Sequence, residues 1–246
     1  MTGCFVVLHT PGENKIRDAC ALGLRTYMSS CLSELDTPTI RITSSDDVKS
    51  FLLSTPEFKL DYKGWDTEYR GSPYIKEKAR PKGWQYGPIG IWASNFYAWK
   101  VFLTTDYDYL LIFENDVKVE DNFFELFSSY INELPQDWEV FHQYVPPMPF
   151  QQRAQHKPIT KNTSISYQTW SNAAYAISRK GAERMIEDVS KGIYLPLDWQ
   201  WFKQRNQYKT YTVSPKSPIG CSLVDVRSTY QYTDQFVDLS FLKDEL

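Results

Sequence analysis

The sequence has few of the features that would place it in a protein class at once. Its 246 residues include only 4 cysteines, with no C-x-x-C pair, so neither a zinc site nor a disulfide framework is expected. No apolar run is long enough to cross a bilayer. The 27 Lys and Arg against 30 Asp and Glu give a net charge of -3, which argues against a polyanion-binding surface over the whole molecule. These absences favour a globular protein in a reducing compartment.

The two ends of the chain predict different locations. The start, MTGCFVVLHT, has about five apolar residues in a row and no basic flank, which does not match a secretory signal. The end, FLKDEL, matches the KDEL-type retrieval signal of residents of the endoplasmic reticulum (ER). We favour a chance ending and a cytoplasmic protein, with the ER lumen as the alternative.

Strand and helix patterns alternate through the first part of the chain. Residues 4–10 and 39–43 have the composition of strands, and residues 13–35 and 44–54 have the spacing of helices. The serines at the start of the last segment suit helix capping. Strand, helix, strand, helix predicts a right-handed crossover and a Rossmann-type α/β fold in a single domain. Its sheet is expected to be mixed and mostly parallel, with helices on its faces.

A punctuated segment and an aromatic helix follow. Residues 55–88 contain repeated proline and glycine, which is typical of a functional lid, and the alternative is an insertion with no task. Residues 89–105 have an apolar stripe of helical spacing. We expect the aromatic side chains of this stripe to lie in the core.

The stretch YDYLLIFENDVKV is apolar until it reaches Glu114, Asn115 and Asp116. Side chains alternate along a strand, so Glu114 and Asp116 are expected on one side and Asn115 on the other. Carboxyl ends of strands border the ligand crevice in open α/β sheets. A divalent cation relieves the repulsion between two carboxylates, which predicts a metal site. The alternative is a solvated strand end.

Three motifs in order resemble glycosyltransferase family 25, the lipooligosaccharide and procollagen galactosyltransferase group. They are GPIGIWASNFYAWKVFLTTDYDYLLIFENDVKV, SNAAYAISRKGAERMI and YLPLDWQWF, spread over roughly residues 84–202. The first motif matches at Gly90, Ser94, Asn95, Trp99, Glu114, Asn115 and Asp116. Asn95 stands where the family usually has histidine, and Asn115 stands where it usually has aspartate.

The resemblance implies a fold of the GT-A type and a nucleotide-sugar donor, expected to be a UDP-sugar. It implies a nucleotide-sugar half at residues 1–120 and an acceptor half at residues 121–246. Asp116 would hold Mn²⁺ or Mg²⁺, and Glu114 would contact the metal or the nucleotide. Ser94 and Asn95 are the further nucleotide-binding candidates. The acceptor is a glycan, a protein side chain or a modified nucleobase. The alternative is an inert relative that binds sugars or partners without catalysis.

The candidate catalytic base is Asp198, which matches the aspartate of the family's Pro-x-Asp segment. An inverting transfer needs a side chain that removes the proton of the acceptor hydroxyl. Trp199 and Trp201 would offer faces for sugar stacking. The alternative for Asp198 is a helix cap. His142, in a predicted strand, is expected in the core; together with Asp225 it is the next candidate for the base.

One further histidine, His156, lies in a proline-rich polar segment. We expect its side chain to be exposed to solvent.

Overall fold

The computed structural model describes residues 1–9, 14–38, 40–61, 64, 86–144, 156–165, 171–203, 207–214, 216–217 and 219–224. Most of the predicted lid at residues 55–88 lies outside these ranges. Asp225 and the C-terminal KDEL also lie outside them.

One eight-stranded sheet organises the described residues, in the order β2-β1-β3-β8-β5-β9-β7-β6. Its strands are β1 (Gly3–Leu8), β2 (Ser33–Glu34), β3 (Tyr109–Glu114), β5 (Val140–His142), β6 (Lys157–Pro158), β7 (Thr163–Ile165), β8 (Ala174–Ser178) and β9 (Thr210–Val213). The strands β2, β1 and β3 run parallel to one another, and β8 runs in the opposite direction. The strands β5 and β9 run in the direction of β1, β7 runs opposite to them, and β6 again runs in the direction of β1. Only β8 and β7 therefore oppose the other strands, and the predicted mixed, mostly parallel sheet is confirmed.

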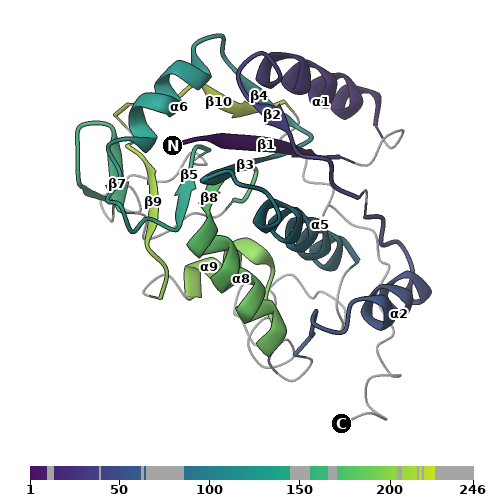
Figure 1. Ribbon diagram of the computed structural model, residues 1–246. Helices are drawn as coiled ribbons and strands as arrows, with labels where there is room; N and C mark the ends of the chain where they lie inside the picture. The colour runs from purple at the N-terminus through teal and green to yellow at the C-terminus, as the bar shows by residue number, and fades with distance from the viewer. Residues whose placement is uncertain are drawn as a thin grey trace, which may run out of the picture.

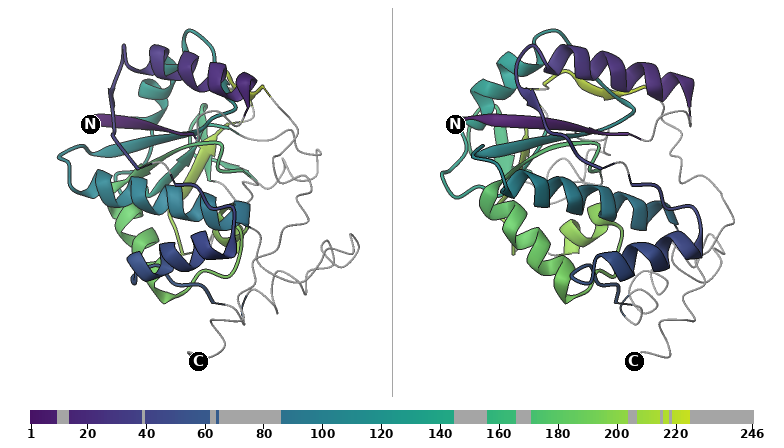
Figure 2. Two further views of the ribbon diagram at one scale, coloured as in Figure 1. Left: turned by 90° about the vertical axis from the view of Figure 1, so that its right-hand side faces the viewer. Right: turned by 45° about the vertical axis from the view of Figure 1, so that its right-hand side comes forward.

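Helices cover both faces of this sheet (Figures 1 and 2). On one face lie α1 (Lys15–Met28) and α6 (Phe123–Ile131), and on the other lie α5 (Tyr86–Leu103), α8 (Arg179–Lys191) and α9 (Leu197–Lys203), with α2 (Ser45–Ser54) packed against α5. A small second sheet joins β4 (Val117–Val119) to β10 (Cys221–Leu223). Both parts of the chain enter the large sheet, which makes a single domain. The assignment of donor binding to residues 1–120 and acceptor binding to residues 121–246 stays a prediction.

The crossover around α1 forms, but its second strand was predicted at the wrong residues. The strand β2 pairs in parallel with β1 at Ser33 and Glu34, directly after α1 ends, and not at residues 39–43. Ile40 and Ile42 still pack against the core, but their backbone joins no described strand. Their alternating apolar pattern therefore indicates that the side chains are buried, but not that the backbone pairs in the sheet.

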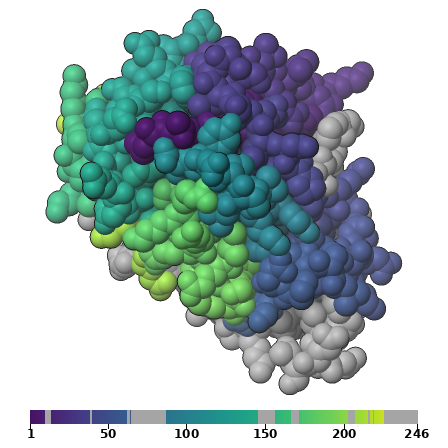
Figure 3. All heavy atoms as spheres, in the orientation of Figure 1, coloured from purple at the N-terminus to yellow at the C-terminus, as the bar shows by residue number. Residues whose placement is uncertain are grey.

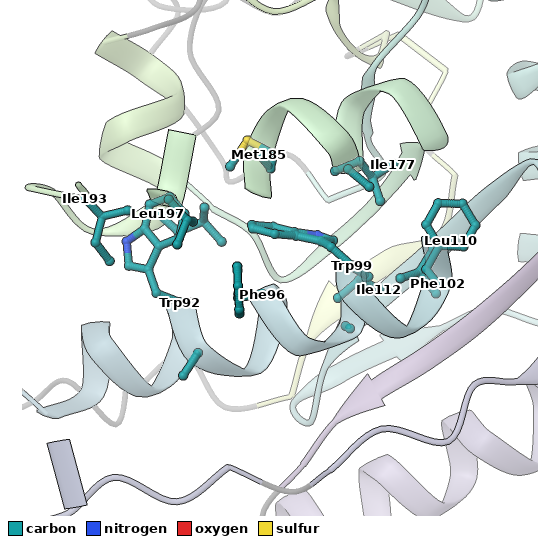
Figure 4. Close-up of a cluster of buried hydrophobic side chains, with 14 of the residues drawn as sticks. Trp92, Phe96, Trp99, Phe102, Leu110, Ile112, Ile177, Met185, Ile193 and Leu197 are labelled. Atoms are coloured by element: carbon teal, nitrogen blue, oxygen red, sulfur yellow. The ribbon is translucent and has the colours of Figure 1, made fainter. Parts of the chain in front are cut away.

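The aromatic stripe of α5 lies in the core, as predicted. Trp92, Phe96 and Trp99 are fully buried, and Figure 4 shows them between α5 and the side chains of α8 and α9. Figure 3 shows the green side chains of α8 directly against the teal side chains of α5.

The close packing of α8 depends on a glycine in its first turn. A Cβ on Gly181 would lie 2.4 Å from the backbone oxygen of Glu139, so only glycine permits this contact with the start of β5. Ser178 caps the helix by accepting a hydrogen bond from the Gly181 N–H at 3.2 Å. Among the described residues, no helix has both the length and the apolarity that a membrane crossing requires.

Candidate active site

The acidic segment after β3 is a turn, and this changes where its side chains point. The strand ends at Glu114, and Asn115 and Asp116 form the turn before β4. Arg17 of α1 contacts both turn residues, with Nη2 lying 3.1 Å from Asp116 Oδ2 and Nη1 donating to Asn115 Oδ1 at 3.4 Å. The expectation that Asn115 points away from Asp116 is therefore wrong, because strand alternation stops at residue 114.

The ion pair between Arg17 and Asp116 is nearly closed to solvent. Only 10% of the Arg17 side chain and 9% of the Asp116 side chain are exposed. Charges attract more strongly away from bulk water, and burial of either one alone would be costly. The pair therefore fixes the start of α1 against the turn that follows β3.

Glu114 is held by an amide from the segment that leads into the neighbouring strand, β8. Asn172, just before β8, donates from Nδ2 to Glu114 Oε1 at 3.0 Å. Burial raises the pKa of Glu114 to about 8, and the negative charges of Asp116 and Asp198 add to the rise while Arg17 opposes it. These influences also show that the three acidic side chains share one region.

Asp198 is the second residue of α9, within its first turn. Burial raises the pKa of its carboxyl to about 6, against the opposing effect of hydrogen bonds from the Trp199 and Asp198 N–H groups. The Trp199 N–H donates to Oδ1 at 3.0 Å. An N-cap precedes the helix and accepts from residues two or three positions further on, so the cap alternative does not match this geometry. Trp92 donates from Nε1 to the Leu195 carbonyl at 2.8 Å and so positions the chain entering α9.

Trp201 is a core residue and not a sugar platform, so that expectation is wrong. It is 3% exposed, and its ring centroid lies 4.9 Å from that of Tyr175 and 5.1 Å from that of His142. Its Nε1 donates to Met185 Sδ at 3.0 Å. Helical periodicity turns Trp201 inward, whereas the partly buried Trp199 stays a predicted sugar contact.

Asn95 lies inside the core, where it hydrogen-bonds to Tyr175. The Tyr175 hydroxyl donates to Asn95 Oδ1, and Asn95 Nδ2 donates to the Ile91 carbonyl at 2.8 Å. Trp99 Nε1 donates to the same hydroxyl at 3.1 Å. Asn95 is 1% exposed, so these protein groups surround its amide, while the adjacent Ser94 is partly exposed. Direct nucleotide contact by either residue stays a prediction.

The two histidines considered in the sequence analysis, His142 and His156, are both buried. His142 is fully buried in β5, as expected, and burial lowers its pKa to about 3, so that it is neutral at pH 7. His156 is only 8% exposed, and burial lowers its pKa as well. The expectation of an exposed His156 is wrong, because the residue directly precedes β6, which extends the sheet edge through β7.

The sequence patterns did not predict several residues of this region. Arg17 and Asn172 are the partners of the two acidic residues at the end of β3. His9 follows β1, whose last residue pairs with Glu114, and its Nε2 lies 2.7 Å from Asp18 Oδ1. One signal was available for Arg17, because a cation in the first turn of a helix opposes the helix dipole and so calls for a partner.

The carboxylates of this region can hold a divalent cation only if a bound molecule completes the coordination of the metal. Among the described residues, no group of three or more His, Cys, Asp and Glu is placed to hold a metal ion. Mg²⁺ is commonly bound by one or two carboxylates together with substrate phosphates and waters. Asp116 and Glu114 match that mode of binding, in which a diphosphate completes the coordination.

Comparison with known proteins assigns the chain to a family. The model of glycosyltransferase family 25 (LPS biosynthesis protein) matches residues 68–201, which is more than half of the chain. The chain therefore belongs to glycosyltransferase family 25, as its motifs predicted. The match includes Glu114, Asp116 and Asp198.

Individual relatives are distant. Procollagen galactosyltransferase 2 of Mus musculus is 25% identical over 165 residues, and the match covers 65% of this chain but only 25% of the mouse protein. A glycosyltransferase that acts in glycosylation of the major capsid of PBCV-1 is 13% identical, with a TM-score of 0.39 over 84% of this chain and 73% of that one. Drosophila β-1,4-galactosyltransferase 7, in a complex with manganese, UDP-Gal and xylobiose, is 10% identical, with a TM-score of 0.43 over 98% and 78% of the two chains.

Proposed function

We propose that this chain is a metal-dependent glycosyltransferase that moves a hexose from a UDP-sugar to an acceptor hydroxyl, with inversion. The observation that carries the proposal is the meeting of Glu114, Asp116 and Asp198 in one region of a family 25 chain. Glu114 and Asp116 lie at the carboxyl end of β3, where open α/β sheets bind ligands. A GT-A arrangement, with the donor bound by residues 1–120 and the acceptor by residues 121–246, is part of this proposal.

Asp116 and Glu114 are the residues that would hold Mn²⁺ or Mg²⁺. The bound cation would stabilise the negative charge that develops on the nucleoside diphosphate as the bond between sugar and phosphate breaks. Asn172 fixes the Glu114 carboxyl by its hydrogen bond to Oε1. We expect this contact to orient Glu114 toward the metal or the nucleotide.

Asp198 would accept the proton of the acceptor hydroxyl as that oxygen attacks the sugar carbon from the face opposite the diphosphate. A carboxyl with a pKa of about 6 is more basic than an ordinary aspartate and is still mostly ionised at pH 7. The hydrogen bond from Trp92 to the Leu195 carbonyl supports the segment that leads to Asp198.

The nucleotide candidates on α5 receive different roles in this proposal. Ser94 is partly exposed and is proposed as a direct contact. Asn95 is proposed to act through Tyr175, because it accepts a hydrogen bond from the Tyr175 hydroxyl. The pKa of that hydroxyl is raised by burial and by the nearby Glu114. Asn95 would thus support the Glu114 side of the site from within the core.

The name of the mouse relative suggests which substrates to test first. It is a procollagen galactosyltransferase, which makes UDP-galactose the first donor and a hydroxyl on a protein side chain the first acceptor. A glycan and a modified nucleobase remain alternative acceptors. An inert binder of sugars or partners is the second candidate function, favoured by the asparagines at positions 95 and 115 and by the pairing of Asp116 with Arg17.

A screen of donors tests the proposal. The purified chain is incubated with a panel of UDP-hexoses, with Mn²⁺ or with a chelator, and release of UDP is measured. Release from one donor that needs Mn²⁺ and disappears in Asp198→Asn is the expected result. Silence with every donor would contradict the proposal and favour the inert binder, and equal release in chelator would remove the metal from it.

A further inference from the structure

The charge of Asp116 is already balanced by the protein itself. The Arg17 guanidinium lies 3.1 Å from Oδ2, and both side chains are about nine-tenths buried. A second guanidinium nitrogen donates to the amide oxygen of Asn115 in the same turn. The cation proposed for this turn would bind the Asp116 carboxylate, whose Oδ2 Arg17 now contacts. A metal ion and the guanidinium therefore compete for one place.

Electrostatics decides when the metal ion can win this competition. A divalent cation added beside the intact ion pair would lie close to the guanidinium in a poorly solvated place, where like charges repel strongly. Asn115 is neutral, so Asp116 is the one carboxylate within the turn. Displacing Arg17 without a new anion would break a nearly buried ion pair without replacing it, which is costly. A diphosphate supplies the negative charge that both cations need.

We infer that Arg17 takes the place of the divalent cation at Asp116 in the nucleotide-free protein, and that the cation enters only together with the diphosphate. This inference rests on the proposed function and deepens it, because it adds a binding order and a further residue to the donor site. Arg17 then has two tasks: it neutralises Asp116 while the site is empty, and it excludes free metal ions.

Binding of Mn²⁺ alone tests the inference without any turnover. Free Mn²⁺ is measured by electron paramagnetic resonance during titration of the wild-type chain, Arg17→Met, and the double variant Arg17→Met with Asp116→Asn. Arg25→Met is the matched control, because Arg25 lies on the same helix and pairs with Glu34 at 2.7 Å, away from the turn. We expect Arg17→Met to bind Mn²⁺ at least about tenfold more tightly than the wild type and the control. The double variant should lose that gain.

Addition of UDP supplies the complementary measurement. The wild-type chain should bind Mn²⁺ tightly once UDP is present. Equal Mn²⁺ affinity of wild type and Arg17→Met, or tight binding of Mn²⁺ by the wild type without UDP, would overturn the inference. Circular dichroism checks the fold of each variant, and Arg17→Gln, which keeps a hydrogen-bond donor, replaces Arg17→Met if that variant does not fold.

The outcome is separable from that of the proposed function. A chain that transfers sugar with Mn²⁺ but shows no gain in Arg17→Met would refute the binding order alone. A gain in Arg17→Met without turnover of any donor would refute the transferase and leave the ion competition in place.

Discussion

The pKa values of two aspartates of this chain are shifted in opposite directions, because their surroundings differ. Asp47, in the first turn of α2, accepts hydrogen bonds from the Thr43 N–H, from the Ser44 N–H and from hydroxyls, and these lower its pKa. Asp198, also in the first turn of a helix, is partly buried, and burial raises its pKa to about 6. Helix position alone therefore does not define the chemistry of an aspartate, and the surroundings decide it.

Asp198→Asn tests the role of the base. The variant should lower sugar transfer by about a hundredfold or more and leave donor binding intact, because asparagine cannot accept the proton. In the wild type, transfer should rise with pH through about 6 as Asp198 ionises, and the variant should lack this limb. Steady-state rates across pH and calorimetry with the donor measure the two effects. Near-normal transfer would exclude Asp198, and Asp225 would then be tested before the buried His142.

The same substitution should change stability in a pH-dependent way. The raised pKa of Asp198 means that its contribution to stability is complete below its ordinary value of 3.8 and is lost as pH rises through about 6. Asparagine does not titrate, so Asp198→Asn should be more stable than the wild type near pH 8, by about 1 to 3 kcal/mol. The gain should shrink toward pH 4. Urea unfolding at both pH values measures the gain, and a gain independent of pH would contradict the raised pKa of Asp198.

At the scale of elements, the sequence predicted what local chemistry determines. Ser44 caps α2 and the aromatic stripe of α5 is buried, as their patterns indicated. The strand β2 was missed because Ser33 and Glu34 are polar and exposed. Their pairing depends on where α1 ends beside β1, and that is a tertiary property that no local pattern carries.

Trp92→Phe tests how α5 supports the start of α9. The substitution removes the hydrogen bond to the Leu195 carbonyl, which lies three residues before Asp198 (the Trp92 ring is seen in Figure 4). An unpaired buried carbonyl should cost about 1 to 3 kcal/mol of unfolding free energy. Transfer should fall as well, with donor affinity unchanged, because α9 shifts. Urea unfolding and kinetics measure the two effects.

Trp138→Phe is the control for this experiment, because Trp138 is buried on the opposite face of the sheet. It should lower stability without lowering transfer at a temperature where both variants are folded. Equal loss of transfer in the two variants would show that Trp92 acts only through global stability.

At the scale of the whole molecule, the site joins residues that are far apart in the sequence. Asn172, before β8, donates to Glu114 of β3, and the charges of Arg17 on α1 and Asp198 on α9 both act on Glu114. The acidic members were predicted from motifs, because their residue types already indicate chemistry. Arg17 and Asn172 were not, because a partner is defined by packing between distant elements. Trp201 was misassigned for the same reason.

Metal-dependent binding of the donor tests the central claim of this account most directly. Calorimetry with a UDP-hexose is performed with Mn²⁺ and with chelator on the wild type, Asp116→Asn and Asp108→Asn. Asp108 is the matched control, because it lies just before the other end of β3, where it accepts from the Thr2 N–H at 2.6 Å. The wild type and Asp108→Asn should bind at least about tenfold more tightly with Mn²⁺, and Asp116→Asn should lose that difference while keeping its fold. Unchanged Mn²⁺-dependent affinity in Asp116→Asn would contradict the account.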